Sequence, residues 1–216
     1  MSVGVGLASV FTDALRGEVC TIVGMAAEPE PVPVHRWASI ADASDRAILA
    51  HCTGPTIDLG CGPGRMAEHL AGRGVDVLGV DVVPEAVAQT RARGVRAVQA
   101  DMFGSLPGEG RWSSALLADG NVGIGGDPSR LLRRAGNLLA AGGRVVVDIA
   151  PPGTGLQIHT VRLRMGGRQS RPFPWAVLGV DALPSVAASA GLVVDAVHDH
   201  EGRWVALLSR TSEEPT

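Results

Sequence analysis

The chain contains no lysine and no tyrosine, and each absence excludes a kind of chemistry. All 19 basic residues are arginine, so neither a Schiff base on lysine nor the lysine of a phosphate-binding P-loop is available. Acidic residues number 22, which gives a formal net charge of −3 and an isoelectric point near 6.1. Nucleic-acid binders usually present a basic face, so we expect no nucleic-acid partner.

Cysteines and long apolar runs are also scarce. The three cysteines, Cys20, Cys52 and Cys61, form an odd set without C-x-x-C spacing, which predicts neither a disulfide framework nor a metal site. No apolar run approaches the roughly 18 residues that a membrane span needs. No basic residue precedes Arg16, so we expect neither a signal peptide nor a membrane partner. Together these features predict a cytoplasmic location.

The most informative segment runs from residue 56 to residue 64, where a short apolar stretch leads into glycines at every second position. Such a stretch is typical of a strand in the centre of a parallel sheet, and glycines after it let the backbone turn sharply and approach a ligand. An apolar periodic stretch, Met66 to Ala71, follows at once and predicts a helix. The order of strand, loop and helix places a ligand at the carboxyl ends of the strands.

The glycine spacing distinguishes between cofactors. A dinucleotide fingerprint G-x-G-x-x-G starting at Gly60 needs glycine at position 65, where this chain has Arg65. The pattern present is D-x-G-x-G-x-G, which resembles motif I of the class I S-adenosylmethionine-dependent methyltransferases. The resemblance implies that the loop wraps the amino-acid end of S-adenosylmethionine. The residues it assigns to this contact are Asp58, Gly60, Cys61, Gly62 and Gly64.

Three further strand-like segments end in acidic residues. Asp81 ends the segment from Val75, and its carboxylate can accept both hydroxyls of a ribose, with Val82 beside it. The resemblance further implies that Asp101 binds the adenine amine and that Met102 packs on the ring.

The third segment, from Ser114 to Asn121, ends beside the expected position of the transferred methyl group. Asp119 and Asn121 are therefore the candidates for the reaction face, and Asp119 is also a cofactor contact.

The length of 216 residues and a hydrophobic fraction of 45% fit one domain. We predict an N-terminal helical lid over residues 1–53, with helices from about 5 to 15 and 43 to 50, the second capped by Asp42 or Ser44. A cofactor-binding core is expected over residues 55–150, with a helix from 128 to about 139 that stops at Gly142-Gly143. Residues 151–216 predict a hairpin of strands 156–165 and 169–178, a helix over 181–190 and a closing strand pair. The resemblance implies an α/β fold: a Rossmann-like three-layer αβα sandwich of about seven mostly parallel strands, the last one antiparallel.

The acceptor pocket is inferred from the scarcity of aromatic residues, of which there are seven. Trp37, Phe173 and Trp175 fall in the predicted lid and hairpin and could form its wall, or could only pack the lid onto the core. Arg36 could pair with the cofactor carboxylate, and the alternative is a solvated surface charge. His159 could act as a general base, with a surface or packing role as the alternative.

The sequence thus predicts an enzyme that transfers a methyl group from S-adenosylmethionine to an oxygen or nitrogen of a small-molecule acceptor, with natural-product tailoring as one setting. A non-catalytic S-adenosylmethionine-binding protein is one alternative. An NAD(P)-dependent oxidoreductase is another, disfavoured by the glycine spacing and by the lack of a Tyr-x-x-x-Lys pair. The oligomeric state is not predicted.

Overall fold

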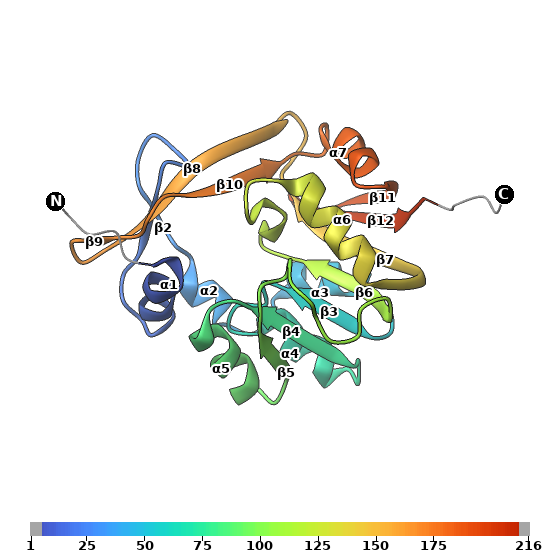
Figure 1. Cartoon of the computed structure of the whole chain (residues 1–216), viewed down its shortest axis with the longest axis horizontal. Coiled ribbons are helices and arrows are strands. Elements are labelled where there is room, and N and C mark those ends of the chain that lie inside the picture. The colour runs from blue at the N-terminus through green and yellow to red at the C-terminus, as the bar shows by residue number, and fades with distance from the viewer. Residues whose placement is uncertain (1–5, 212–216) are drawn as a thin grey trace.

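A seven-stranded sheet forms the centre of the computed structural model, which describes residues 6–211 (Figure 1). Its strand order is β11-β12-β7-β6-β3-β4-β5. The strands are β3 (Thr56–Leu59), β4 (Val77–Asp81), β5 (Arg96–Gln99), β6 (Trp112–Leu117), β7 (Leu139–Ile149), β11 (Leu192–His200) and β12 (Arg203–Arg210). Only β12 runs antiparallel to its neighbours β7 and β11. The predicted number of strands and the antiparallel last strand are therefore confirmed.

Helices cover both faces of this sheet. α3 (Ala43–Leu49) and α4 (Arg65–Gly72) pack on one face, with α5 (Pro84–Ala92) beside α4 along β4 and β5. α6 (Pro128–Leu138) and α7 (Leu183–Ser189) pack on the other. Adjacent residues of β6 show the division, because Leu116 packs with α3 and α4 whereas Leu117 packs with α6 and α7. The three-layer αβα sandwich is therefore confirmed.

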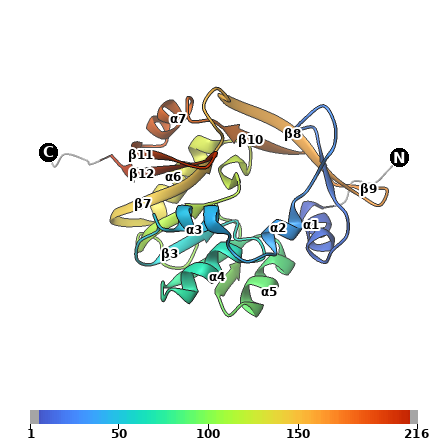
Figure 2. The same cartoon turned by 180° about the vertical axis from the view of Figure 1, so that it is seen from behind.

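A second sheet lies beside the carboxyl ends of the central strands (Figures 1 and 2). It contains β1 (Thr21–Val23), β2 (Glu30–Pro31), β8 (Leu156–Met165), β9 (Arg168–Gln169) and β10 (Phe173–Leu178). α1 (Leu7–Leu15) packs on it, and α2 (Val34–Trp37) follows β2 in the chain. The short helix η1 (Asn121–Gly123) joins it to the core, because the next residue, Ile124, forms a bridge with Trp175.

The hairpin predicted after the fifth strand is present, since β8 pairs antiparallel with β10 and Val161 lies opposite Phe173. Its second strand begins at Phe173 instead of residue 169. Pro172 has no N–H to donate, and the Ser170 hydroxyl accepts a hydrogen bond from the Leu163 N–H at 3.0 Å. The predicted N-terminal helical segment also contains two short strands, β1 and β2, which complete the second sheet.

The start of α3 agrees with the sequence prediction, whereas the end of α6 differs from it. Asp42 and Asp45 form a capping box at the start of α3. Of the two predicted caps, Asp42 and Ser44, the structure therefore uses Asp42. α6 ends at Leu138, and Gly142 and Gly143 lie inside β7 instead of ending the helix. Val5, the expected first residue of α1, lies outside the described residues.

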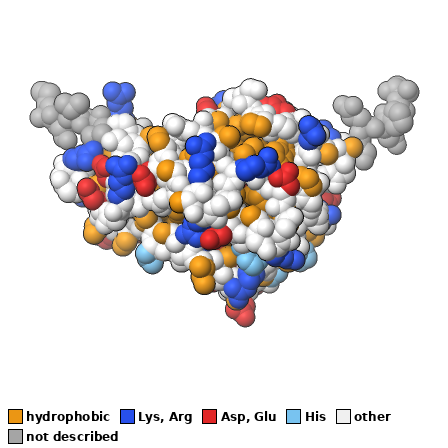
Figure 3. Space-filling model, turned by 90° about the horizontal axis from the view of Figure 1, so that it is seen from below, with side chains coloured by type: hydrophobic (Ala, Val, Ile, Leu, Met, Phe, Trp, Pro, Cys, Tyr) orange, Lys and Arg blue, Asp and Glu red, His pale blue; other side chains and the backbone are white. Residues whose placement is uncertain are grey.

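The described residues contain no helix long and apolar enough to cross a membrane. On the face shown in Figure 3, arginine and acidic side chains are interspersed among hydrophobic and uncharged ones.

Candidate active site

One cavity of about 1090 Å³ lies between the carboxyl ends of the central strands and the second sheet. It brings together most of the side chains that the sequence singled out. Those on its wall are Arg36, Trp37, Gly60, Cys61, Gly62, Asp81, Val82, Asp101, Met102, Asp119, Asn121, Phe173 and Trp175. Asp58, Gly64 and His159 are not on the wall. Most of the predicted cofactor residues and the predicted acceptor residues therefore line one cavity.

The glycine loop after β3 forms one side of the cavity. Gly62 has a φ of +54° and no atom within 4 Å of the position that a Cβ would occupy, so the backbone is open towards a ligand. A Cβ on Gly64 would meet the Thr90 hydroxyl at 2.7 Å, so glycine is required there by packing. The Thr90 hydroxyl donates to the Gly62 carbonyl at 2.9 Å and fixes the loop from α5.

Asp81, at the end of β4, also holds this loop. Its two carboxylate oxygens accept the Gly62 N–H at 2.9 Å and the Val83 N–H at 2.8 Å. Burial raises the pKa of Asp81, and these backbone hydrogen bonds oppose the rise. Each oxygen keeps a second lone pair, so the carboxylate can still accept two hydroxyl groups.

The next strand end along the cavity carries Asp101 and Met102. Asp101 accepts the Phe103 N–H at 2.9 Å, which fixes the orientation of its carboxylate. Met102 is buried and lies on the cavity wall. This pair offers a polar acceptor beside an apolar surface, the combination that a purine ring with an exocyclic amine requires.

Asp58 lies beneath the glycine loop and is fully buried. Its Oδ2 has no hydrogen-bond partner among the described residues. Burial and the nearby carboxylates of Asp119 and Asp81 raise the pKa of Asp58 to about 7. A buried carboxylate with an unsatisfied oxygen is costly, so this position suits a ligand that supplies a positive charge.

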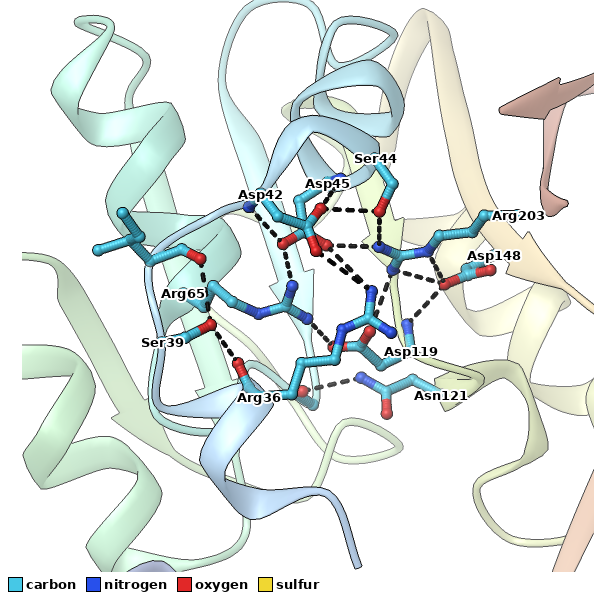
Figure 4. Close-up of polar contacts among 12 residues, drawn as sticks. Arg36, Ser39, Asp42, Ser44, Asp45, Arg65, Asp119, Asn121, Asp148 and Arg203 are labelled. Carbon is cyan, nitrogen blue, oxygen red and sulfur yellow. Dashed lines mark hydrogen bonds and ion pairs between the residues drawn. The ribbon is translucent and has the colours of Figure 1, made fainter. Parts of the chain in front are cut away.

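A closed ring of ion pairs lies beside the loop (Figure 4). Arg65 donates to Asp45 and Asp119, and Arg203 donates to the same two carboxylates. Asp45 and Arg65 are 0% and 2% exposed. Arg203 also donates to Asp148, at 2.9 Å from Nε and 2.7 Å from its terminal nitrogen. The ring thus ties together α3, α4, β7, the loop after β6 and the start of β12.

The ring defines the state of Asp119. Its backbone has a φ of +52°, unusual for a residue other than glycine, and its N–H donates to Asp148 Oδ2 at 3.0 Å. Oδ1 accepts from Arg203 and Oδ2 from Arg65. Because both oxygens are bound to guanidinium groups, the Asp119 carboxylate is held in a fixed orientation on the cavity wall.

Asn121 is fixed in a similar way. Its Nδ2 donates to the carbonyl oxygens of Leu59 at 3.0 Å and Gly60 at 2.8 Å, so the side chain supports the glycine loop. Its Oδ1 receives no hydrogen bond from the described residues and remains free to accept one from a ligand.

The two other polar candidates differ in position. Arg36 lies on the wall, 3.8 Å from both Asp42 and Asp45, and its side chain is 43% exposed. These distances exceed a direct hydrogen bond, so its guanidinium is available to a ligand. His159 lies on β8 away from the wall, with Nε2 3.3 Å from Gln157 Oε1, so its position does not support the general-base role.

Sequence reasoning missed four charged residues of the site: Asp45, Arg65, Asp148 and Arg203. Asp148 stands near the end of β7, and the strand-end rule that selected Asp81 could have found it. Arg65 directly follows the glycine loop, and this position beside a predicted ligand site could have indicated a role in the site. Asp45 and Arg203 are 158 residues apart and meet only in the fold, so no local pattern indicates their contact.

The described residues offer no alternative site for a metal ion. Within residues 6–211, no group of three or more His, Cys, Asp or Glu side chains is arranged to hold a metal ion. His51, His198 and His200 are close to one another, but the rings of His51 and His198 stack at 4.5 Å between centroids.

Comparison with known proteins agrees with this geometry. Residues 57–143 match the family model described as a methyltransferase domain. An S-adenosylmethionine-dependent methyltransferase of Bacteroides fragilis, solved with S-adenosylhomocysteine, is similar with a TM-score of 0.80 and 19% identity, over 95% of this chain and 94% of that one. No curated protein sequence matches the chain significantly.

Two further solved structures are similar over most of the chain. The Burkholderia thailandensis 1,6-didemethyltoxoflavin-N1-methyltransferase has a TM-score of 0.59 and 19% identity, over 79% of each chain. A sugar N-methyltransferase of Streptoalloteichus sp. ATCC 53650 has a TM-score of 0.57 and 18% identity, over 81% of this chain and 88% of that one.

The fold and the glycine-loop cavity define a Rossmann-like nucleotide-binding domain. Residues 57–143 match a methyltransferase domain, and the chain has the fold of S-adenosylmethionine-dependent methyltransferases. The predictions of an enzyme of this family and of S-adenosylmethionine as cofactor are thereby confirmed.

Proposed function

We propose that the protein transfers a methyl group from S-adenosylmethionine to a small molecule held between the glycine loop and the second sheet. The observation that carries this proposal is the single cavity, whose wall contains Gly62 and Asp81 together with Trp37, Phe173 and Trp175. A volume of about 1090 Å³ is large for one ligand, since drug-sized pockets span roughly 300 to 1,000 Å³. It therefore suits a cofactor and an acceptor side by side.

The residues present fit the zwitterionic end of the cofactor. Asp58, buried beneath the glycine loop and off the cavity wall, would place its negative charge near an ammonium without touching it, and Arg36 has a guanidinium on the wall that suits a carboxylate. Gly62, on the same cavity wall as Arg36, has open space in front of its backbone. In this arrangement Asp81 takes the ribose hydroxyls, and Asp101 and Met102 take the adenine.

The cofactor supplies an electrophilic methyl group on a sulfonium. The protein's part is then to orient the acceptor atom behind that methyl and to exclude water, and positioning of this kind supplies roughly 7 to 11 kcal/mol in favourable cases. Asn121 Oδ1 is free to accept a hydrogen bond from the acceptor. Asp119, whose carboxylate is held by two arginines, forms a rigid part of the cavity wall beside the acceptor.

Two of the similar solved structures are nitrogen methyltransferases of small molecules, one of 1,6-didemethyltoxoflavin and one of a sugar. They support a small-molecule acceptor and are consistent with natural-product tailoring. A non-catalytic cofactor-binding protein remains the alternative, and it predicts cofactor binding without turnover on any acceptor.

Thermal unfolding in the presence of cofactors tests the proposal. S-adenosylmethionine or S-adenosylhomocysteine at 100 times its dissociation constant should stabilise the protein by about 2.7 kcal/mol, a shift in Tm of roughly 5 to 11 °C. NAD and NADP at the same concentration serve as controls and should give no shift. A shift with a nicotinamide cofactor alone would contradict the proposal.

Replacing Asp81 by alanine should weaken cofactor binding by about 1.5 to 3 kcal/mol, as expected for hydrogen bonds to a charged group. The measurement is isothermal titration calorimetry with S-adenosylhomocysteine. Asp76→Ala is the matched control, because Asp76 is exposed and directly precedes the opposite end of β4. Equal affinities of the two folded variants would remove the ribose role from Asp81.

A further inference from the structure

We infer that the acceptor is a basic amine on an apolar, aromatic-sized body, and that Asp148 accepts a hydrogen bond from that amine. This inference rests on the proposed function and names the substrate class of the same cavity. It combines the lining of the acceptor side, the charge of the wall and the position of one buried carboxylate.

The acceptor side of the cavity is built for an apolar body. α1, α2 and β10 each place an aromatic side chain on the wall, and the rings of Phe11 and Trp37 lie 6.3 Å apart. Aliphatic and methionine side chains also line this side. Its apolar residues include Phe11, Met25, Trp37, Leu163, Phe173 and Trp175.

The charges on the wall disfavour an anionic acceptor. The lining includes six carboxylates and three guanidiniums, so it stays acidic even with the single net positive charge of the cofactor. Arg65 and Arg203 are held by carboxylates, and Arg36 is assigned to the cofactor. Glu30 and Glu201 are exposed at the rim and form no ion pair with the described residues. No free arginine on the described wall is therefore left for a carboxylate or phosphate.

Asp148 supplies a specific contact within this acidic lining. It is 8% exposed and lies on the wall at the end of β7, next to the end of β6. Its Oδ2 accepts hydrogen bonds from Arg203 and from the Asp119 N–H, whereas Oδ1 receives none from the described residues. A buried carboxylate with one oxygen left open on a cavity wall suits an N–H or ammonium donor.

The chemistry of transfer fits this assignment. A bound ammonium first gives a proton to Asp148, whose pKa is raised by burial against the opposing effect of Arg203. The nitrogen lone pair then forms the new N–C bond while the C–S bond breaks and its electron pair stays on sulfur. The products are a methylated ammonium and the neutral thioether S-adenosylhomocysteine. The proton held by Asp148 passes to water when the product leaves.

Three probes with the same indole body test the inference: tryptamine, the alcohol tryptophol and the acid indole-3-propionate. Their dissociation constants are measured by calorimetry at pH 7 on protein saturated with S-adenosylhomocysteine. Tryptamine should bind at least 10-fold more tightly than tryptophol, and indole-3-propionate should bind most weakly. Equal or tighter binding of the alcohol or the acid overturns the inference, and so does the absence of binding by all three probes.

The Asp148→Asn variant tests whether Asp148 causes the preference for an amine. It should reduce the advantage of tryptamine over tryptophol to less than 3-fold, mainly by weakening the binding of tryptamine. An unchanged preference in the folded variant overturns the role of Asp148. If Asp148→Asn does not fold, the comparison of probes on the unaltered protein still decides the substrate class, and Glu201→Gln at the rim should lower the preference about 2-fold. If the unaltered protein does not bind S-adenosylhomocysteine, that result contradicts the proposed function instead.

Discussion

Replacing Arg65 by methionine is expected to lower the free energy of unfolding by about 3 to 5 kcal/mol, the usual cost of removing one partner from a buried ion pair. The side chain is almost fully buried, and it binds both Asp45 and Asp119. Methionine fills a similar volume but leaves two carboxylates sharing only Arg203. Urea denaturation followed by circular dichroism measures the change.

Two further variants separate the ion-pair ring from a general effect of losing an arginine. Arg96→Met removes a surface pair with Asp76, whose side chains are 65% and 59% exposed, and should cost less than about 1 kcal/mol. The double variant Arg65→Met/Asp45→Leu should recover part of the loss, because it removes the buried charge that Arg65→Met leaves unpaired. A loss below 1 kcal/mol for Arg65→Met would show that the ring does not stabilise the fold.

The sequence predicted the central sheet well because its signals are local. β3, β4 and β6 are short apolar runs with a glycine or an acidic residue at their end or within two positions after it, and periodicity detects such runs. The glycine loop and Asp81 were found for the same reason. The second sheet was only half predicted, since β1 and β2 contain three and two residues and are too short to show alternation.

The charged part of the site depends on contacts distant in sequence. Asp45 lies near the start of α3 and Arg203 at the start of β12, and each would be expected on the surface by its type. Only the topology, with β12 inserted between β7 and β11, brings Arg203 against Asp148. His159 shows the opposite error, a residue that the sequence selected and the structure places elsewhere. It has suitable chemistry and lies on the hairpin, but away from the cavity wall.

This division has a physical basis in the function. Cofactor recognition uses backbone turns and strand ends, which short motifs encode. The acceptor side uses side chains from α1, α2, β8 and β10, which meet only after both sheets have formed. Acceptor identity is therefore the property least accessible to sequence patterns, and the charge of the wall is the first structural information on it.

Replacing Asp58 by asparagine is expected to stabilise the protein without cofactor at pH 8 and to weaken cofactor binding at least 10-fold. The pKa of Asp58 is about 7 in the folded chain and near 3.8 when unfolded. Because the folded-state pKa is raised, the stability from its bound proton is complete below about pH 4 and is lost as pH rises through 7. At about 1.4 kcal/mol per pKa unit the loss is on the order of 4 kcal/mol, and asparagine does not undergo it.

The measurement is the difference in free energy of unfolding between Asp58→Asn and the unaltered protein, by urea denaturation at pH 4, 6 and 8. The difference should grow with pH, whereas Asp76→Asn, which changes an exposed carboxyl, should show no such growth. A constant difference would contradict the raised pKa. Cofactor binding reverses the sign of the effect, because an ammonium held in the cavity near Asp58 favours the carboxylate form of Asp58. The affinity of the unaltered protein should therefore fall as pH drops below 7, and that of Asp58→Asn should not. The residue that destabilises the empty site is then the one whose charge favours the bound cofactor.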